Sequence, residues 1–125
     1  MLKHTLPAVL ALSLFAGCGG NAPTVGPSGT KVGAQCTASR DCQQGSLCTT
    51  AGDFSNGVVG MCTVPCTSDA NCPTGSACVT TSNQTFCAVS CSILADCAGF
   101  GRGWTCKTEG APSGAVRDPL VCRLP

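Results

Sequence analysis

The chain has 125 residues, of which 13 are cysteine, with seven basic and six acidic side chains. A cysteine content this high is typical of a disulfide scaffold in a short exported protein. The near-zero net charge excludes a basic surface for nucleic acid, so we expect no nucleic-acid partner. Large apolar side chains are few, with four Phe, one Trp and no Tyr, so we expect disulfides rather than a single ordinary core to offset the entropy cost of folding.

Residues 1–17 have the composition of a signal peptide. Lys3 precedes the mainly apolar segment 6–15, and two small residues follow that segment. Ten residues span about 15 Å as a helix, whereas the hydrocarbon core of a bilayer needs about 20 residues. We therefore predict a signal helix that is removed, rather than a transmembrane helix. Without Lys3, the mature chain carries equal numbers of basic and acidic side chains.

The segment Leu14-Phe15-Ala16-Gly17-Cys18 resembles the lipobox of bacterial lipoproteins. The resemblance implies that the leader is cut before Cys18, that a lipid is attached to its thiol, and that several acyl chains hold the protein at a membrane. In the family that this segment resembles, an Asp after the lipidated cysteine often marks retention in the inner membrane, so Gly19 at that position implies the outer membrane or the cell surface. Without Cys18 twelve cysteines remain, an even number that can pair completely. The alternative is an ordinary signal peptide with Cys18 paired or free.

Residues 18–35 contain the lipidated cysteine and a stretch rich in Gly, Pro, Ser and Thr. This stretch has no apolar periodicity, which is typical of a disordered linker. We predict a flexible tether between the lipid and the folded part of the chain.

The remaining cysteines form three tandem units, 36–65, 66–90 and 91–125. In the first two units the first three cysteines are separated by five residues each, and the third unit has eight residues in its second interval. The interval between the third and fourth cysteine varies from unit to unit. The twelve cysteines are Cys36, Cys42, Cys48, Cys62, Cys66, Cys72, Cys78, Cys87, Cys91, Cys97, Cys106 and Cys122.

Other positions repeat along with the cysteines. The equivalent residues are Thr37, Thr67 and Ser92 after the first cysteine; Asp41, Asn71 and Asp96 before the second; Gly45, Gly75 and Gly103 before the third; and Met61, Phe86 and Val121 before the fourth. We expect the Ser or Thr to cap a helical turn, the Asp or Asn to form an Asx-turn, and the glycine to take a positive φ.

The fold class that follows is a small, irregular, disulfide-rich fold with short β-hairpins, three tandem modules in all. Each unit should consist of a helical turn or loop and a small irregular hairpin. Four cysteines allow three pairings, and we predict first-to-third and second-to-fourth in each unit, because this crossing gathers the four sulfurs into one small core.

The segment 66–78 resembles the Cys-x2-Asp-x-Asp-Cys-x2-Gly-x2-Cys signature of extracellular cysteine-rich modules. The amino-terminal region of Dickkopf-type proteins and the whey-acidic-protein modules are similar, and tandem units of this kind also occur in bacterial surface lipoproteins. The resemblance implies a small extracellular disulfide-bonded module. The chain lacks the Cys-Cys pair of whey-acidic modules, so their protease inhibition does not carry over.

The third unit alone carries a local departure from the repeat, in the glycine-rich segment 99–104. Phe100, Arg102 and Trp104 alternate there with glycine, and we predict them as a binding loop, since Trp and Arg are enriched at interface hot spots. The alternative is that Phe100 and Trp104 fill a core that has few other large residues.

Catalysis is not expected, because the only histidine, His4, lies in the leader and the acidic residues show no catalytic spacing. We expect no cofactor and no resident metal. The predicted function is that of a lipid-anchored, non-enzymatic binding module of the cell envelope, with an unidentified protein or glycan partner. The alternatives are a passive structural protein of the envelope and, less favoured, a metal-binding protein with cysteine ligands such as Cys62 and Cys66.

Overall fold

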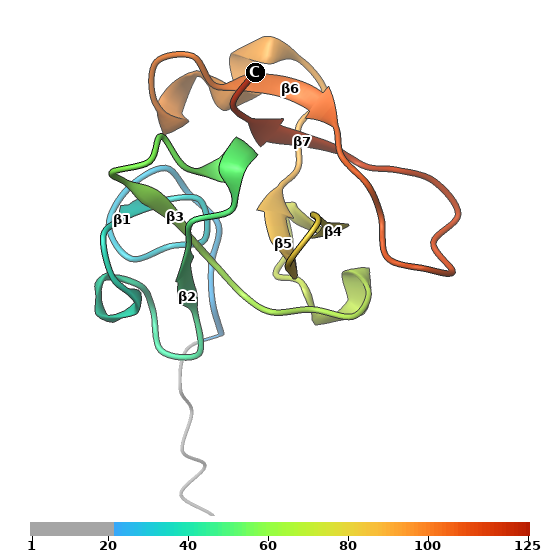
Figure 1. Ribbon diagram of the computed structural model, residues 1–125, viewed down its shortest axis with the longest axis horizontal. Coiled ribbons are helices and arrows are strands. Elements are labelled where there is room, and N and C mark those ends of the chain that lie inside the picture. The colour runs from blue at the N-terminus through green and yellow to red at the C-terminus, as the bar shows by residue number, and fades with distance from the viewer. Residues whose placement is uncertain (1–21) are drawn as a thin grey trace, which may run out of the picture.

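The computed structural model describes residues 22–125 (Figure 1). The predicted signal helix, Cys18 and the first part of the tether lie outside the described residues. The strands are β1 (Gln35–Cys36), β2 (Leu47–Thr49), β3 (Gly60–Thr63), β4 (Ser76–Thr80), β5 (Thr85–Val89), β6 (Thr105–Thr108) and β7 (Leu120–Arg123). The 3-10 helices are η1 (Ser39–Asp41), η2 (Gly52–Phe54), η3 (Asp69–Asn71) and η4 (Leu94–Phe100).

Each tandem unit forms an antiparallel hairpin preceded by a helical turn, as predicted. The hairpins are β2–β3, β4–β5 and β6–β7, and β1 adds a third strand beside β3 in the first unit. The third and fourth cysteines of every unit lie directly opposite each other across the hairpin. The repeated glycine before the third cysteine has a φ of 83°, 91° and 89° in the three units, which confirms the expected left-handed turn.

The six disulfides have the crossed pairing predicted from the sequence. Each bridge closes a loop of 12 to 25 residues, worth about 3 kcal/mol in the chain-entropy model. The two bridges of a unit lie together, and in each unit three of the sulfurs are within 4.8 Å of one another. The pairs are Cys36–Cys48, Cys42–Cys62, Cys66–Cys78, Cys72–Cys87, Cys91–Cys106 and Cys97–Cys122.

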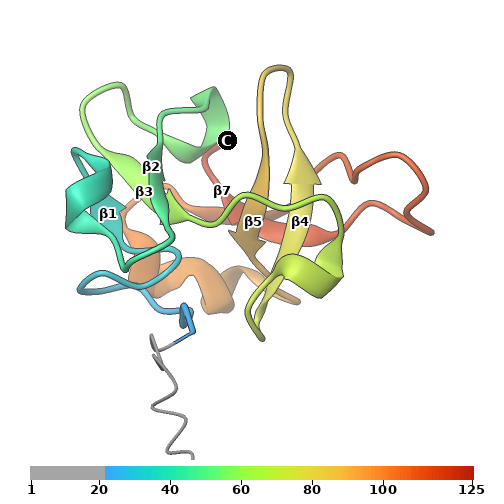
Figure 2. The same ribbon diagram turned by 90° about the horizontal axis from the view of Figure 1, so that it is seen from below.

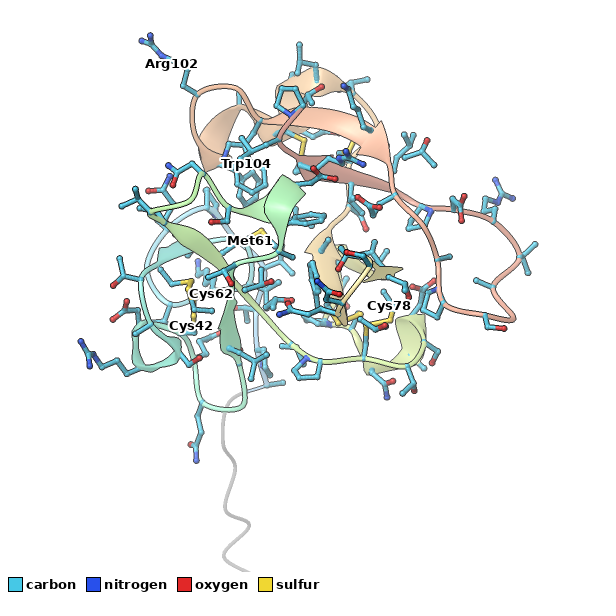
Figure 3. The ribbon with its side chains drawn as sticks, in the orientation of Figure 1. Cys42, Met61, Cys62, Cys78, Arg102 and Trp104 are labelled. Atoms are coloured by element: carbon cyan, nitrogen blue, oxygen red, sulfur yellow. A yellow bond between two sulfur atoms is a disulfide. The ribbon has the colours of Figure 1, made fainter. Side chains whose placement is uncertain are left out.

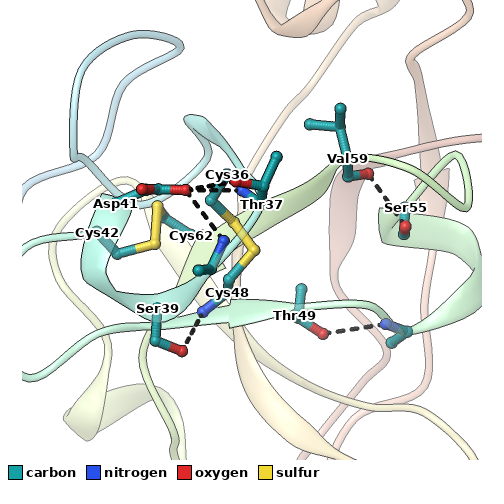
Figure 4. The surroundings of a disulfide bond; sticks show 12 residues. Cys36, Thr37, Ser39, Asp41, Cys42, Cys48, Thr49, Ser55, Val59 and Cys62 are labelled. Carbon is teal, nitrogen blue, oxygen red and sulfur yellow. Dashed lines mark hydrogen bonds between the residues drawn. A yellow bond between two sulfur atoms is a disulfide. The ribbon is translucent and has the colours of Figure 1, made fainter.

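The helical turns are held by the residue before the second cysteine, and this corrects two local expectations. In the first unit Asp41 Oδ2 accepts the N–H groups of Thr37 and Ala38, at 2.9 and 3.0 Å (Figure 4). The Thr37 hydroxyl donates to the same oxygen, so it does not cap the turn. The aspartate binds residues that precede it, whereas an Asx-turn would bind residues that follow. Asn71 and Asp96 repeat the arrangement in their own units.

The three units share one apolar core. Met61, Phe86 and Val121, the equivalent residues before the fourth cysteine, are at most 2% exposed and belong to the same cluster. Phe54 of η2 joins them, with its ring edge against Phe86 at a centroid distance of 5.0 Å. The disulfides therefore stabilise the fold together with this small shared core, and the three units pack against one another.

Residues 24–34 pack against the folded part, which corrects the prediction of a flexible tether for this stretch. Val32 is fully buried, and its backbone pairs with that of Val25. The segment also hydrogen-bonds β3, through Gly33 N–H to the Cys62 carbonyl at 2.9 Å and Cys62 N–H to the Ala34 carbonyl at 2.8 Å. The composition of this segment suggested disorder. The segment is nevertheless ordered, because a few small and apolar residues pack and hydrogen-bond against the folded part.

Gly33 illustrates how closely this segment is packed. Its φ is 101°, and a Cβ added there would lie 2.5 Å from Phe100 Cε1 and 2.7 Å from Val89 Cγ2. Gly29 also has a positive φ, of 73°, but a Cβ there would meet nothing within 4 Å. Substitution of Gly29 therefore tests the cost of backbone strain alone, whereas substitution of Gly33 tests backbone strain together with overpacking.

We expect Gly33→Ala to lower the free energy of unfolding by about 1–3 kcal/mol more than Gly29→Ala does, because only the first substitution overpacks the interior. Both variants carry the backbone cost of about 1–2 kcal/mol for a left-handed alanine. Denaturant unfolding of the two oxidised variants beside wild type measures the difference. Equal losses for both would show that residues 24–34 are not docked.

The carboxylates of the first and third turns make stability depend on pH. Hydrogen bonds from the backbone N–H groups of Thr37 and Ala38, with one from the Thr37 hydroxyl, hold the pKa of Asp41 below its usual value of 3.8. Bonds from Ser92 and Ile93 lower the pKa of Asp96 in the same way. Because the folded pKa is the lower one, these bonds stabilise the fold above the unfolded pKa, and this contribution is lost as the pH falls through the folded pKa.

The second unit shows how to remove this dependence, because Asn71 fills the same role without titrating. We expect the double variant Asp41→Asn, Asp96→Asn to lose less stability than wild type between about pH 5 and pH 2. Thermal unfolding followed by circular dichroism at both pH values measures the two losses. The prediction is wrong if wild type and variant lose the same amount.

Candidate functional site

The extra residues of the third unit lengthen its helical turn. η4 has seven residues, whereas η1 and η3 have three each. This longer helix carries Phe100 at its end, where the ring is 7% exposed and packs in a cluster with Val89, Cys97 and Cys122. Phe100 is therefore a core residue, which corrects its prediction as an exposed binding anchor. The helix gives the reason, because it turns the side chain inward onto the docked residue Gly33.

Trp104 lies between the interior and the surface. Its ring packs against both the shared core and the Phe100 cluster, with a centroid distance of 6.3 Å to the Phe100 ring. One part of the side chain remains exposed. Arg102 lies at the surface, and its side chain points away from Trp104 (Figure 3). The structure thus places the three predicted residues in three different environments rather than on one flat patch.

A small pocket nevertheless connects Trp104 and Arg102. Its volume is about 220 Å³, and the first and third units line it together, with Gln35 and Asn56 among the polar residues. This is below the range of about 300–1,000 Å³ that is usual for small-molecule sites. The pocket therefore fits a single side chain or another small group of a partner. The sequence identified two of its residues but contained no signal for the contribution of the first unit.

The third unit also exposes two apolar side chains on its helical turn. Ile93 and Leu94 are 60% and 64% exposed. In the other units, the position of Leu94 holds Ser39 and Asp69, whose side chains accept the N–H of the third cysteine. Leucine cannot accept that hydrogen bond, so the third turn differs from the others in chemistry as well as in length.

Within residues 22–125, a cysteine metal site is not available while the disulfides are intact. The three sulfur clusters have suitable spacing, with sulfurs within 4.8 Å of one another in each unit. However, a metal binds the thiolate, and each of these sulfurs is bonded to another sulfur. The pair Cys62 and Cys66, whose spacing suggested zinc, bonds instead to Cys42 and Cys78.

Six disulfides are typical of a protein in an oxidising location outside the cytosol. Among residues 22–125, no helix has the length and apolar character needed to cross a bilayer. Comparison of the chain with protein-family models, characterised proteins and solved structures finds no match. The geometry of the described residues is therefore the basis for assigning a function.

Proposed function

We propose that this protein is a non-enzymatic binding module of the cell envelope, anchored to a membrane through a lipid on Cys18. The observation that carries the binding role is the placement of Trp104. This partly exposed aromatic residue borders a pocket between two disulfide-stapled units, and Arg102, whose exposed side chain points outward (Figure 3), borders the same pocket. An aromatic and an arginine held on a rigid support are the residue types that dominate interface energies.

The arrangement of the disulfides supports the lipid anchor. All twelve cysteines between 36 and 122 pair with one another, so the described part of the chain leaves no cysteine to bond with Cys18. Exported proteins seldom keep a free thiol, and the lipobox resemblance implies that the Cys18 thiol carries a lipid. The proposed location is the outer membrane or the cell surface.

A passive structural role in the envelope is the second candidate. Burial of Phe100 favours it, because the segment 99–104 then has a packing function that needs no partner. The two candidates differ in whether Arg102, which contributes little to packing, affects what the protein binds.

The anchor is tested by Cys18→Ser in cells that express the full chain. We expect the variant to leave the membrane fraction or to accumulate with its leader uncut, because no thiol is available for the lipid. Membrane fractionation and intact-mass measurement of the mature protein report both effects. Unchanged fractionation and maturation would contradict the lipid anchor and leave the binding role to be judged separately.

The binding role is tested by capture from envelope extract with the soluble chain 22–125. This chain retains residues 24–34, which a version starting at Cys36 would lack. We expect a specific partner whose capture falls about tenfold with Arg102→Ala, at an unchanged melting temperature. Lys107→Ala is the matched control, since Lys107 is an exposed cation on β6 outside this pocket. A passive role predicts no specific capture or capture that Arg102→Ala leaves unchanged.

A further inference from the structure

The hairpin loops of the first two units meet at one place, where the hairpin loop of the third unit begins. We call them L1 (50–59), L2 (81–84) and L3 (109–119), the segments that connect β2 to β3, β4 to β5 and β6 to β7. They are the parts of the repeat whose length differs in every unit. L1 and L2 rise on the same side of the molecule (Figure 2), and L3 begins beside them. Variable loops on a constant scaffold are where binding functions concentrate.

A polar pocket lies where these loops meet. Its volume is about 380 Å³, within the usual range for small-ligand sites, and every residue that lines it belongs to L1, L2 or L3. The lining residues are Thr50, Ala51, Gly52, Asp53, Thr81, Ser82, Asn83, Gln84 and Glu109. The pocket is distinct from the one beside Trp104, with which it shares no residue.

Contacts of the loops with one another's flanking strands hold the pocket in shape. The hydroxyl of Thr49, the last residue of β2 before L1, donates to Gln84 Oε1 of L2 at 2.7 Å. The N–H of Thr80, the last residue of β4 before L2, donates to the Gly110 carbonyl of L3 at 2.8 Å. Arg123 joins L1 to L3 through ion pairs of 2.7 Å with Asp53 and 2.8 Å with Glu109. A site fixed in advance in this way loses little entropy when a ligand binds.

The chemistry of the lining fits a sugar. Hydroxyl, amide and carboxylate groups dominate it and supply both donors and acceptors, and each hydroxyl of a sugar is both a donor and an acceptor. The Thr49 hydroxyl donates to the Gln84 oxygen, and the side-chain N–H groups of Gln84 make no hydrogen bond within residues 22–125, so these donors are available. Asn83 makes no side-chain hydrogen bond within residues 22–125, so both of its polar atoms are available.

The net charge of the groups at the pocket indicates which class of sugar should bind most tightly. Arg123, whose side chain is 19% exposed and does not line the pocket, forms ion pairs with the carboxylates of Asp53 and Glu109 and neutralises one of the two charges. The pocket therefore presents a net negative charge to a ligand. We propose that it binds a saccharide, and that a saccharide with a free, protonated amino group binds more tightly than a neutral one. This inference depends on neither the Cys18 lipid nor the Trp104 pocket.

The test is a titration of the oxidised chain, with Cys18→Ser to keep it soluble, by isothermal calorimetry or NMR. The probes are the β-1,4-linked disaccharides of glucosamine and of glucose, at a pH where the amine is protonated. Because no aromatic ring lines the pocket, we expect dissociation constants on the order of 1 mM, and at least about threefold tighter binding of the glucosamine probe. Glucuronic acid should bind more weakly than glucose.

Variants then locate the binding. Asn83→Ala removes an exposed amide that holds no other group, and we expect it to weaken both disaccharides about tenfold. Gln44→Ala, an exposed amide outside the pocket, is the matched control and should change nothing. Asp53→Asn should abolish the preference for glucosamine while glucose still binds. A fold check by NMR spectrum accompanies each variant.

The outcomes separate this inference from the proposed function. Loss of saccharide binding with Asn83→Ala but not with Arg102→Ala supports a sugar site that is separate from the Trp104 pocket. The inference is overturned if neither disaccharide binds, if Asn83→Ala has no effect, or if lysine amide binds while both sugars fail. Capture of a partner through Arg102 would remain to be judged on its own experiment.

Discussion

The crossed disulfide pair of each unit is the constraint on which the rest of the structure depends. It joins a helical turn to a hairpin and places the third and fourth cysteines opposite each other. Successive residues of a strand point to opposite faces, so the residue before the fourth cysteine must face away from the sulfurs. That residue is Met61, Phe86 or Val121, and the three meet in the shared core. One covalent pattern thus fixes both the interior of each unit and the face that joins the units.

Association of the units compensates for their small size. Each unit alone has few apolar residues, and its sulfurs form only a small cluster. The shared core, the ion pairs of Arg123 and the docked segment 24–34 bring the three units together with contacts that are distant in sequence. The Leu124 N–H to Asp53 carbonyl bond, 2.8 Å long, returns the end of the chain to the first unit. L1 takes part in this association, because it contains the buried residue Phe54 and the ion-paired Asp53.

This division between scaffold and loops explains where function is to be sought. The Trp104 pocket and the pocket of L1, L2 and L3 each combine residues from different units, so neither exists in a single repeat. Both depend on the disulfides, since loops of this length and composition have no regular structure of their own. We propose binding chemistry for both pockets, because each brings polar side chains from different units together on a disulfide-linked support.

The sequence by itself determined the repeats, the even cysteine count after Cys18 and the left-handed glycines, and it limited the pairing in each unit to three possibilities, of which the crossed one was predicted. These features are local or repeat at fixed spacing, so one chain contains several copies of the same evidence. Only the tertiary structure decided that residues 24–34 dock, that Phe100 is buried, and that L1, L2 and L3 meet. Those outcomes depend on how the units pack against one another. No periodicity encodes that packing, because it depends on contacts between residues far apart in the chain, such as Gly33 with Phe100 and Thr49 with Gln84.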